Sequence, residues 1–320
     1  MSTLLLDRNA VNTLMKMSDV ISVLEEAFRI WGEGKGNMPP KVYLPVEYGD
    51  FRAMPAALPG CAGMKWVNAH PQNPSRSLPS VMAIMIYNDP ETGYPLAIMD
   101  ATEITAYRTG AAAAIASKYL ARQDSYTIGI IGAGRQAYTQ ILAHAELFSP
   151  ISINAFDIST DAVDRLIRCF PEFSIRNCSI QEAAASDIVC TLTPSRSPII
   201  KKEWIMGGTH VNAVGADATG KEELDPLILK EAIVIVDDLE QASAGGEINV
   251  PIQKGVYTIG EVQGTLAELV MGTKRGRTDD KVITVFDSTG IAIEDIAVAK
   301  LLFEKAQEMG GYPSIDLIGT

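Results

Sequence analysis

The sequence predicts an α/β protein with a mostly parallel sheet in one domain and a smaller α+β domain beside it. In the second half of the chain, short apolar runs recur at spacings long enough for a crossover helix between them. Residues 39–100 instead contain apolar segments separated by Pro and Gly turns, as is typical of antiparallel strands. With 320 residues, 47% of them hydrophobic, the chain has enough material for two compact domains.

The first domain is expected to begin with a helix. Ser18 can cap a segment whose apolar residues recur at helical spacing, and the glycine-rich stretch 32–36 ends that segment. Strands are expected at 42–44, 63–67 and 81–87. An alanine-rich helix is then expected from about residue 105 to residue 122.

The second domain is expected to begin where continuous apolar runs replace this pattern. The run at 126–131 has the length of a buried strand, and a glycine turn and a helical segment follow it. Further strands of the same sheet are expected at 151–156, 187–192, 209–214, 233–236 and 282–286. A last helix, from about residue 294 to residue 307, leaves this sheet. We therefore predict a first domain of residues 1–117 with 298–320, and a second of residues 118–297.

Composition and charge argue against several classes of function. The formal net charge of -12 opposes nucleic acid binding, because a polyphosphate partner requires a basic surface. Asp7 and Arg8 interrupt the N-terminal apolar triplet and no apolar run reaches membrane-spanning length, so we expect a cytoplasmic protein with no membrane partner. The four cysteines lack CxxC spacing and the three histidines form no ligand cluster, so we expect neither disulfides nor a metal site.

A glycine motif follows the first strand of the second domain. Gly132, Gly134 and Ala137 fit GxGxxA at the start of a helix, the pattern of a Rossmann dinucleotide-binding domain. Gly132 permits a tight turn, Gly134 lets a pyrophosphate approach the backbone, and Ala137 lets the helix pack on the strand. The helix N-terminus supplies N–H groups to the phosphates. We include Arg135 and Gln136, inside the motif, among the expected cofactor contacts.

An acidic residue ends the next predicted strand. Asp157 lies roughly twenty residues beyond the motif, where a carboxylate accepts hydrogen bonds from the adenosine ribose hydroxyls. Its charge repels a 2′-phosphate, so we predict NAD rather than NADP. A glycine triplet alone also occurs as a turn in unrelated α/β proteins, and the alternative for Asp157 is a helix N-cap or turn residue. The two features together favour a dinucleotide.

Nine spaced segments extend the evidence over nearly the whole chain. They read NMPPKVYL, RAMPA, GMKWVN, AYRTGAAA, GAGRQA, TPS, NAVGAD, GGEIN and FDSTG, at residues 37–44, 52–56, 63–68, 106–113, 132–137, 193–195, 212–217, 245–249 and 286–290. This pattern resembles the ornithine cyclodeaminase and μ-crystallin family, and within it most closely the archaeal-type alanine dehydrogenases. The resemblance implies a Rossmann domain joined to a smaller α+β domain that carries much of the substrate site and the interface of a homodimer.

The resemblance also assigns three cations to the substrate. In the family, the lysine that matches Lys65 faces the substrate, where a cation binds the carboxylate and polarises the reacting carbon. Without the family match, a lysine on a strand is more often exposed, and burial would lower its pKa. Arg52 and Arg108 are expected beside it, because a guanidinium holds a carboxylate through two parallel hydrogen bonds. The alternative for either arginine is a surface ion pair.

The remaining expected site residues lie at strand ends. Asp217 follows the strand 209–214, at the carboxyl end where a parallel sheet binds its ligands, and is our candidate for the general acid or base; the alternative is a turn cap. Cofactor contacts are expected from the family match at Arg108, Thr109, Thr193, Ser195, Gly215, Asp217, Ser288 and Gly290. No catalytic role is assigned to His70, His144 or His210, and His144 is expected on a helix surface.

Several activities share this scaffold, and all of them use one hydride step. Cyclodeaminases of the family place a glutamate two residues before the MetPro pair at 54–55, where it binds the distal ammonium of ornithine. Here that residue is Arg52, a cation that would repel the ammonium and attract a carboxylate. The sequence therefore favours reversible NAD-dependent deamination of L-alanine to pyruvate and ammonia, with a small amino acid or keto acid as substrate.

Three alternatives stay open at this point. Two are other reactions of the same scaffold, the conversion of L-ornithine to L-proline and the reduction of ketimines or cyclic imines. The third is a non-catalytic ligand carrier, as μ-crystallins can be. The presence of Lys65, Arg108 and Asp217 together weighs against a carrier.

Overall fold

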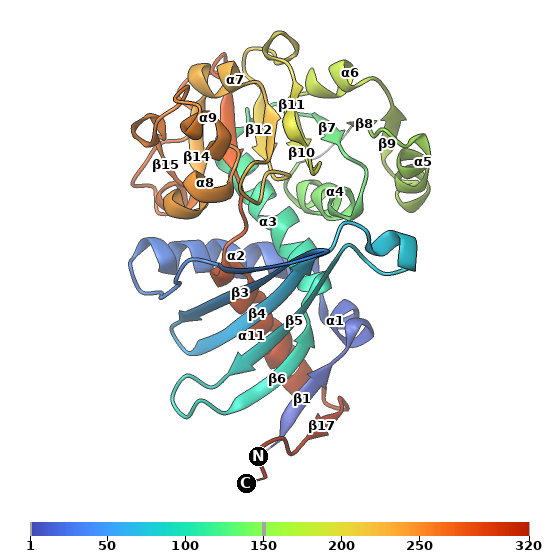
Figure 1. The fold of residues 1–320 in the computed structure, drawn as a ribbon, viewed down its shortest axis with the longest axis vertical. Helices are drawn as coiled ribbons and strands as arrows, with labels where there is room; N and C mark the ends of the chain where they lie inside the picture. The colour runs from blue at the N-terminus through green and yellow to red at the C-terminus, as the bar shows by residue number, and fades with distance from the viewer. Residues whose placement is uncertain (1, 149–151, 320) are drawn as a thin grey trace. The chain divides into compact units, whose positions relative to one another are not determined.

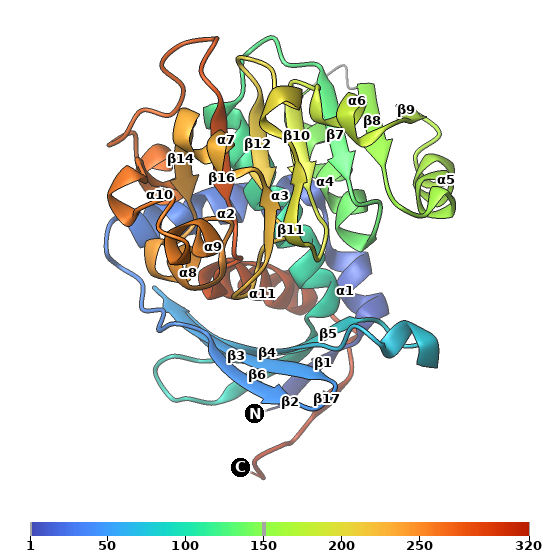
Figure 2. The same ribbon diagram turned by 45° about the horizontal axis from the view of Figure 1, so that its top comes forward.

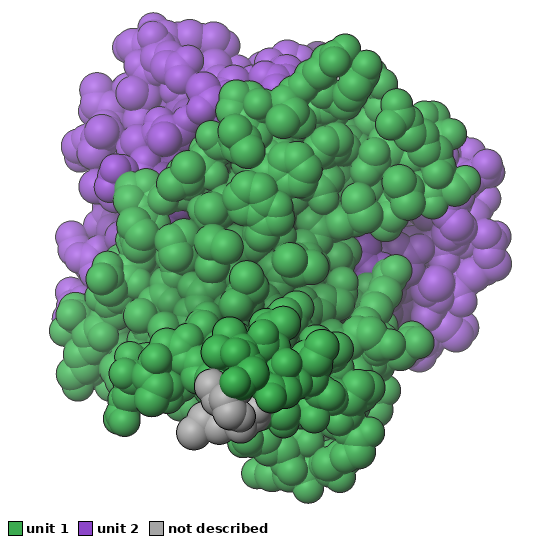
Figure 3. Space-filling view, turned by 60° about the horizontal axis from the view of Figure 1, so that its bottom comes forward, with its two compact units in different colours: residues 1–108, 291–320 green, residues 109–290 purple. Residues whose placement is uncertain are grey.

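The computed structural model describes residues 2–148 and 152–319 and divides into two compact units (Figure 1). Unit 1 comprises Met1–Arg108 and Ile291–Thr320, and unit 2 comprises Thr109–Gly290 (Figure 3). Among the described residues, no helix combines the length and the hydrophobicity needed to span a bilayer. The sequence predicted domain boundaries after residues 117 and 297. The roles given to the two domains, substrate binding with dimerisation and dinucleotide binding, stay a prediction.

Unit 1 is built on a mainly antiparallel sheet with the strand order β17-β1-β6-β5-β4-β3-β2. Its strands are β1 (Thr3–Leu6), β2 (Val42–Val46), β3 (Gly49–Leu58), β4 (Cys61–Ala69), β5 (Val81–Asn88), β6 (Pro95–Asp100) and β17 (Ser314–Ile315). Only the β1–β6 pair among these described strands is parallel. Residues along β3 alternate in burial, as expected for a strand with one face against a core.

Helices cover one face of this sheet. They are α1 (Arg8–Leu14), α2 (Met17–Gly32) and α11 (Ala292–Met309), with a short 3₁₀ turn, η1 (Asn73–Arg76), in the β4–β5 connection. Helix α11 packs on β3, β4 and β5 and also contacts α2. The predicted cap at Ser18 is wrong, because α2 begins at Met17, so Ser18 lies inside the helix and the N-cap position is Lys16. The alanine-rich helix, α3, spans Thr102–Leu120.

Unit 2 contains a parallel sheet with the order β15-β14-β16-β12-β10-β7-β8-β9, and all of these strands except β15 are labelled in Figure 2. They are β7 (Thr127–Ile131), β8 (Ser152–Phe156), β9 (Ser174–Asn177), β10 (Ile188–Thr191), β12 (His210–Ala213), β14 (Ile233–Val236), β15 (Gly264–Thr265) and β16 (Thr284–Asp287). A separate parallel pair, β11 (Arg196–Ile200) and β13 (Glu222–Leu224), was not predicted. The central strands are buried throughout, which explains their continuous apolar runs.

The connections of this sheet are mostly short helices. They are α4 (Arg135–Leu147), α5 (Thr160–Cys169), α6 (Ile180–Ala184), α7 (Pro226–Glu231), α8 (Leu239–Gly245), α9 (Asn249–Gln253) and α10 (Leu266–Val270), with the 3₁₀ turns η2 (Lys202–Trp204) and η3 (Ile259–Glu261). From β7 the chain passes outward to β8 and β9, then returns to β10 on the other side of β7. The order therefore reverses between β7 and β10, and in open parallel sheets ligands bind at the carboxyl ends of the strands beside such a reversal.

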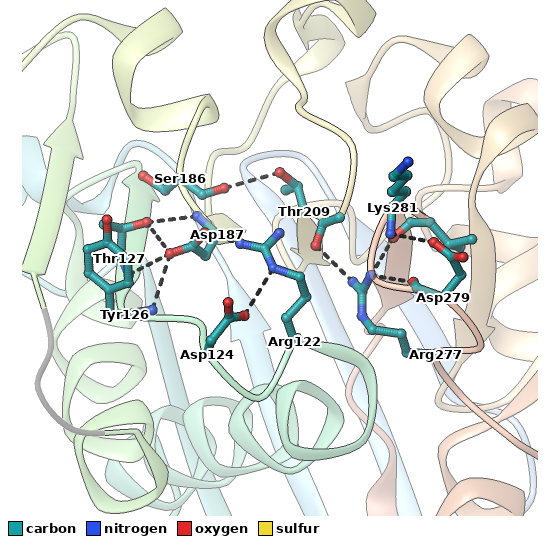
Figure 4. Close-up of polar contacts among 12 residues, drawn as sticks. Arg122, Asp124, Tyr126, Thr127, Ser186, Asp187, Thr209, Arg277, Asp279 and Lys281 are labelled. Carbon is teal, nitrogen blue, oxygen red and sulfur yellow. Dashed lines mark hydrogen bonds and ion pairs between the residues drawn. The ribbon is translucent and has the colours of Figure 1, made fainter.

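The amino ends of the strands are held together by polar contacts (Figure 4). Asp187, just before β10, accepts hydrogen bonds from the backbone N–H of Thr127 at 3.0 Å and from its Oγ1 at 2.7 Å, and forms an ion pair with Arg122. Arg277 donates to the carbonyl oxygens of Leu120 at 2.8 Å and Gly208 at 2.9 Å. These contacts lie at the amino ends of the strands, whereas ligands bind at the carboxyl ends. We therefore assign them a role in stability.

The buried side chain of His144 contradicts a prediction made from the sequence. His144 was expected on a helix surface, but it is fully buried, with Nε2 2.9 Å from Ser117 Oγ and Nδ1 2.8 Å from the carbonyl oxygen of Gln140. The residue lies three positions after Ile141 and seven after Ala137, so it shares their inward face. Burial lowers the pKa of His144 to about 4, and the ring is therefore neutral at pH 7.

The contacts of Asp187 generate a stability prediction. Burial acts to raise the pKa of this carboxyl group, but hydrogen bonds from Thr127 and from the Tyr126 and Thr127 backbone outweigh it and lower the pKa. Asp187→Asn should reduce the free energy of unfolding by about 2 kcal/mol at pH 7, measured by urea denaturation. The difference from wild type should shrink as the pH falls through the lowered pKa, because the wild-type carboxylate then becomes protonated.

The matched control is Asp124→Asn. Asp124 also pairs with Arg122, at 3.2 Å, but its side chain is 83% exposed. Its replacement should change the free energy of unfolding by less than about 0.5 kcal/mol. Equal losses for the two variants would contradict the stabilising role given to Asp187.

Candidate active site

Lys65 is the most buried cation of unit 1. It lies in the middle of β4, opposite Met54 of β3 and Met85 of β5, on the face of the sheet that α11 covers. Only 1% of the residue is exposed. Its Nζ lies 2.8 Å from Oδ1 and 2.7 Å from Oδ2 of Asp295, in the first turn of α11. The surface lysine that a strand position alone would suggest is therefore not found here.

The same carboxylate also binds Arg108. The Nε of Arg108 lies 3.2 Å from Oδ1 of Asp295, and its NH1 lies 2.8 Å from Oε2 of Glu294. All of these groups are buried. Two cations and two carboxylates thus form one buried cluster, in which Asp295 bridges Lys65 and Arg108. We call these four residues the ion cluster.

The ion cluster places the Lys65 amine close to its neutral form. Burial is the largest cause and lowers its pKa, the charge of Arg108 lowers it further, and Asp295 partly restores it, which leaves a pKa of about 7. At neutral pH, Nζ can therefore hold or release a proton at small cost. A group with such a pKa suits proton transfer, whereas an ordinary lysine would stay charged.

Arg52 lies on the same face of the sheet as Lys65. It stands opposite Val67, two residues from Lys65 along β4, so the two cations are diagonal neighbours across β3 and β4. Arg52 is 8% exposed, its Nε lies 2.7 Å from Oδ1 of Asp50, and its guanidinium lies over the Tyr43 ring at 5.3 Å from the centroid.

Sequence reasoning missed the two acidic residues of the ion cluster. Glu294 and Asp295 are adjacent acids in a helix that is otherwise mostly apolar, and both are buried. A buried carboxylate requires compensating partners, either a cation or hydrogen-bond donors. Two adjacent acids in an apolar helix therefore indicate partners elsewhere in the chain. The sequence does not say which residues those partners are.

In unit 2, the glycine motif lies at the carboxyl end of β7. Gly132 has φ of 102°, a conformation that favours glycine, and a Cβ there would come within 3.1 Å of Thr193 Cγ2 in the loop after β10. Gly134 is the N-cap of α4, and a Cβ on it would meet no atom within 4 Å. The loop is therefore tight at Gly132 and open at Gly134, where the first N–H groups of α4 lack helical partners.

Asp157 directly follows β8, beside this loop. Its Oδ2 accepts a hydrogen bond from the N–H of Ala133 at 2.7 Å, and its Oδ1 accepts one from the N–H of Ser159 at 2.8 Å. The carboxylate thus lies against the glycine loop and also forms a local turn. Each of its oxygens has a second lone pair, so the carboxylate keeps acceptor capacity for another donor.

The other strand-end residues are tied to buried or partly buried carboxylates. Thr193 and Gly215 both donate backbone N–H groups to Glu223, at 2.7 Å and 3.0 Å. Gly290 donates its N–H to Asp237 at 2.7 Å. Asp217, half-buried, forms an ion pair with Lys221. The other residues expected to contact the cofactor differ in exposure. Arg135 is exposed, Gln136 is partly buried, and Thr109 and Ser288 are buried. The hydroxyl group of Ser195 donates to the carbonyl oxygen of Ser197 at 2.7 Å.

The chain and its architecture have close counterparts among known proteins. Alanine dehydrogenase of Archaeoglobus fulgidus is 52% identical over 309 residues, which is 96% of each chain. Ornithine cyclodeaminase of Brucella abortus is 32% identical over 317 residues, 97% of this chain and 86% of that one.

Solved structures of related enzymes also resemble this chain closely. An archaeal alanine dehydrogenase dimer with bound NAD matches with a TM-score of 0.97 at 50% identity, over 99% of this chain and 100% of that one. Thermococcus litoralis Delta(1)-pyrroline-2-carboxylate reductase, in complex with NADH and L-proline, matches with a TM-score of 0.94 at 38% identity, over 98% and 100% of the two chains. The predicted fold class, a Rossmann-type domain with a second domain, is confirmed. The sequence model of the ornithine cyclodeaminase/mu-crystallin family matches residues 1–310, and the chain belongs to this family.

Proposed function

We propose that the chain is an NAD-dependent dehydrogenase that converts L-alanine to pyruvate and ammonia, reversibly, by hydride transfer from the α-carbon. The observation that carries the proposal is the buried ion cluster, in which Lys65 has a pKa of about 7 beside Arg108. Likeness to alanine dehydrogenases at 52% and 50% identity supports the choice of substrate. We further propose a cytoplasmic homodimer, in keeping with the dimeric archaeal relative.

The residues of unit 2 fit a dinucleotide. Gly132 to Gly134 and the start of α4 form a loop that is open where a diphosphate would approach, and Asp157 keeps acceptor capacity for ribose hydroxyls. NAD bound there would supply the hydride acceptor. The negative charge of Asp157 disfavours the additional phosphate of NADP. Thr109, Arg135, Gln136, Thr193, Ser195, Gly215, Ser288 and Gly290 are proposed as further contacts.

The cations of unit 1 fit the substrate carboxylate. Arg108 and Arg52 each carry a guanidinium, which binds a carboxylate through paired hydrogen bonds and so fixes the orientation of the α-carbon. Lys65 Nζ binds the same carboxylate when protonated and takes up a proton from the substrate when neutral. Its pKa of about 7 keeps both forms available at neutral pH.

Asp217 is proposed as the general acid or base in the hydrolytic half of the reaction. After the hydride has left the α-carbon, water adds to the resulting imine and ammonia departs, and each step moves a proton. The carboxylate of Asp217 forms an ion pair with Lys221, four residues along the chain, and this contact fixes its position.

Reduction of a cyclic imine is the second candidate, because the reductase of Thermococcus litoralis is 38% identical with a TM-score of 0.94. It uses the same hydride step in the opposite direction. Ornithine cyclodeamination is less favoured, because Arg52 stands on the Lys65 face of the sheet and would repel a second ammonium group.

Steady-state assays separate these activities. We expect NADH formation with L-alanine and NAD, and a kcat/KM at least about tenfold lower with L-ornithine, since a mispaired buried charge costs more than one factor of ten. Cyclic imines with NADH test the reductive candidate. NADH formation with ornithine but not with alanine would contradict the proposed substrate.

The pH profile tests the role of Lys65. For wild type we expect an ionisation near pH 7 in kcat/KM, which reports groups of the free enzyme. Asp295→Asn should move that ionisation to lower pH, because it removes a negative charge that raises the pKa of Lys65. Asp50→Asn, which changes a carboxylate paired with Arg52 outside the ion cluster, is the control. An unchanged ionisation in Asp295→Asn would show that the profile does not report Lys65.

A further inference from the structure

Four carboxylates of unit 2 are buried near the carboxyl ends of the parallel strands. They are Glu223, Asp237, Glu247 and Asp287. None was singled out from the sequence, although Glu247 and Asp287 lie in the GGEIN and FDSTG segments. Each of them accepts at least one hydrogen bond from a backbone N–H group of a neighbouring segment. Such bonds stabilise a buried carboxylate and at the same time fix the loop that donates them.

Three of these groups are linked in series. Glu223 receives the N–H and Oγ1 of Thr193 at 2.7 and 2.6 Å and the N–H of Gly215 at 3.0 Å. The backbone N–H of Glu223 in turn donates to Glu247 at 2.9 Å. The N–H of Glu247 then donates to Asp287 at 2.8 Å. Asp287, at the end of β16, therefore holds Glu247, and Glu247 in turn holds the backbone of Glu223.

The glycines of this region explain why the loops pack so closely. A Cβ on Gly215 would lie 2.2 Å from the carbonyl oxygen of Thr193 and 2.4 Å from Oε2 of Glu223. A Cβ on Gly246 would lie 2.5 Å from both carboxylate oxygens of Asp287. No side chain fits at such distances, so both glycines are required by the approach of a carboxylate to the backbone.

We propose that Glu223 is a positioning residue for the dinucleotide, acting through the loops after β10 and β12. This inference rests on the proposed function, in which Thr193 and Gly215 contact the cofactor and Asp217 acts on the substrate. Glu223 joins the two loops by accepting donors from both at once. Gly215 is also held from its other side, because its carbonyl oxygen lies 3.3 Å from Lys221 Nζ, and the same ammonium pairs with Asp217.

The chemistry of this position calls for a carboxylate. A carboxylate only accepts hydrogen bonds, and three donors from two loops converge on Glu223. Burial raises the pKa of Glu223, while the hydrogen bonds from Thr193 and Gly215 act in the opposite direction. An amide in its place keeps one oxygen but turns an NH₂ group toward either Thr193 or Gly215, so a donor faces a donor in one of the two loops.

Calorimetric titration of the full chain with NAD tests the inference on Glu223→Gln. We expect the Kd for NAD to rise at least about tenfold, since a charge-assisted hydrogen bond to a cofactor loop is lost. The KM for NAD should rise more than kcat falls, because the cofactor loops move while the substrate cations stay in place.

The matched control is Glu222→Gln, one residue earlier on β13. Glu222 is equally buried, but its carboxylate pairs with Lys254 at 3.0 Å and binds neither cofactor loop. Both variants lose one buried carboxylate, so a general loss of stability affects both, whereas only Glu223→Gln should weaken NAD binding. If Glu223→Gln does not fold, Glu223→Asp replaces it: this variant keeps the charge but shortens the side chain, and its Kd for NAD should rise above that of wild type. An unchanged Kd for Glu223→Asp would then overturn the positioning role.

The outcomes separate this inference from the proposed function. Wild-type protein is titrated first, and failure to bind NAD would overturn the proposed function together with this inference. Normal binding by wild type with an equal Kd for Glu223→Gln, or an equal rise for Glu222→Gln, would overturn the positioning role alone.

Discussion

Asp295 holds two cations, Lys65 and Arg108, in a part of unit 1 that is closed to solvent. A buried charge without a partner is strongly destabilising, so each member of the ion cluster requires the others. This requirement joins three segments far apart in the chain: the middle of β4, the second turn of α3 and the first turn of α11. The same burial that demands the pairing also brings the pKa of Lys65 to about 7, so a constraint of the fold creates the reactive amine.

Unit 2 uses carboxylates in a different way. Here Glu223, Glu247 and Asp287 bind backbone N–H groups, and the result is a set of fixed loops at the edge where a parallel sheet binds its ligands. Four of the nine segments quoted from the sequence, TPS, NAVGAD, GGEIN and FDSTG, meet in this network. Their glycines and acids are thus explained by one packing arrangement. A site that is rigid before its ligand arrives loses less entropy on binding.

Local features could be predicted from the sequence, and pairings between distant residues could not. The apolar runs predicted six of the eight described strands of the parallel sheet, because buried strands need no alternation, whereas β9 and β15 contain no such run and were missed. Lys65 was identified by resemblance alone. The residues next to it in the sequence do not indicate that its partner is Asp295, 230 residues away. Glu223 escaped notice for the same reason. His144 was placed wrongly on the surface although its spacing from Ala137 and Ile141 indicated the inward face, because a polar residue type was given more weight than its position.

The most direct test of this account replaces Lys65 by Met, which keeps most of the length of the side chain and removes its amine, and with it the charge and the proton. NAD affinity should stay within about twofold of wild type, because the groups proposed to bind the dinucleotide belong largely to unit 2. Turnover of L-alanine should fall at least about a hundredfold, as expected for loss of a proton-transfer group. A Lys65→Met enzyme that oxidises alanine at close to the wild-type rate would contradict the central role given to the buried ion cluster.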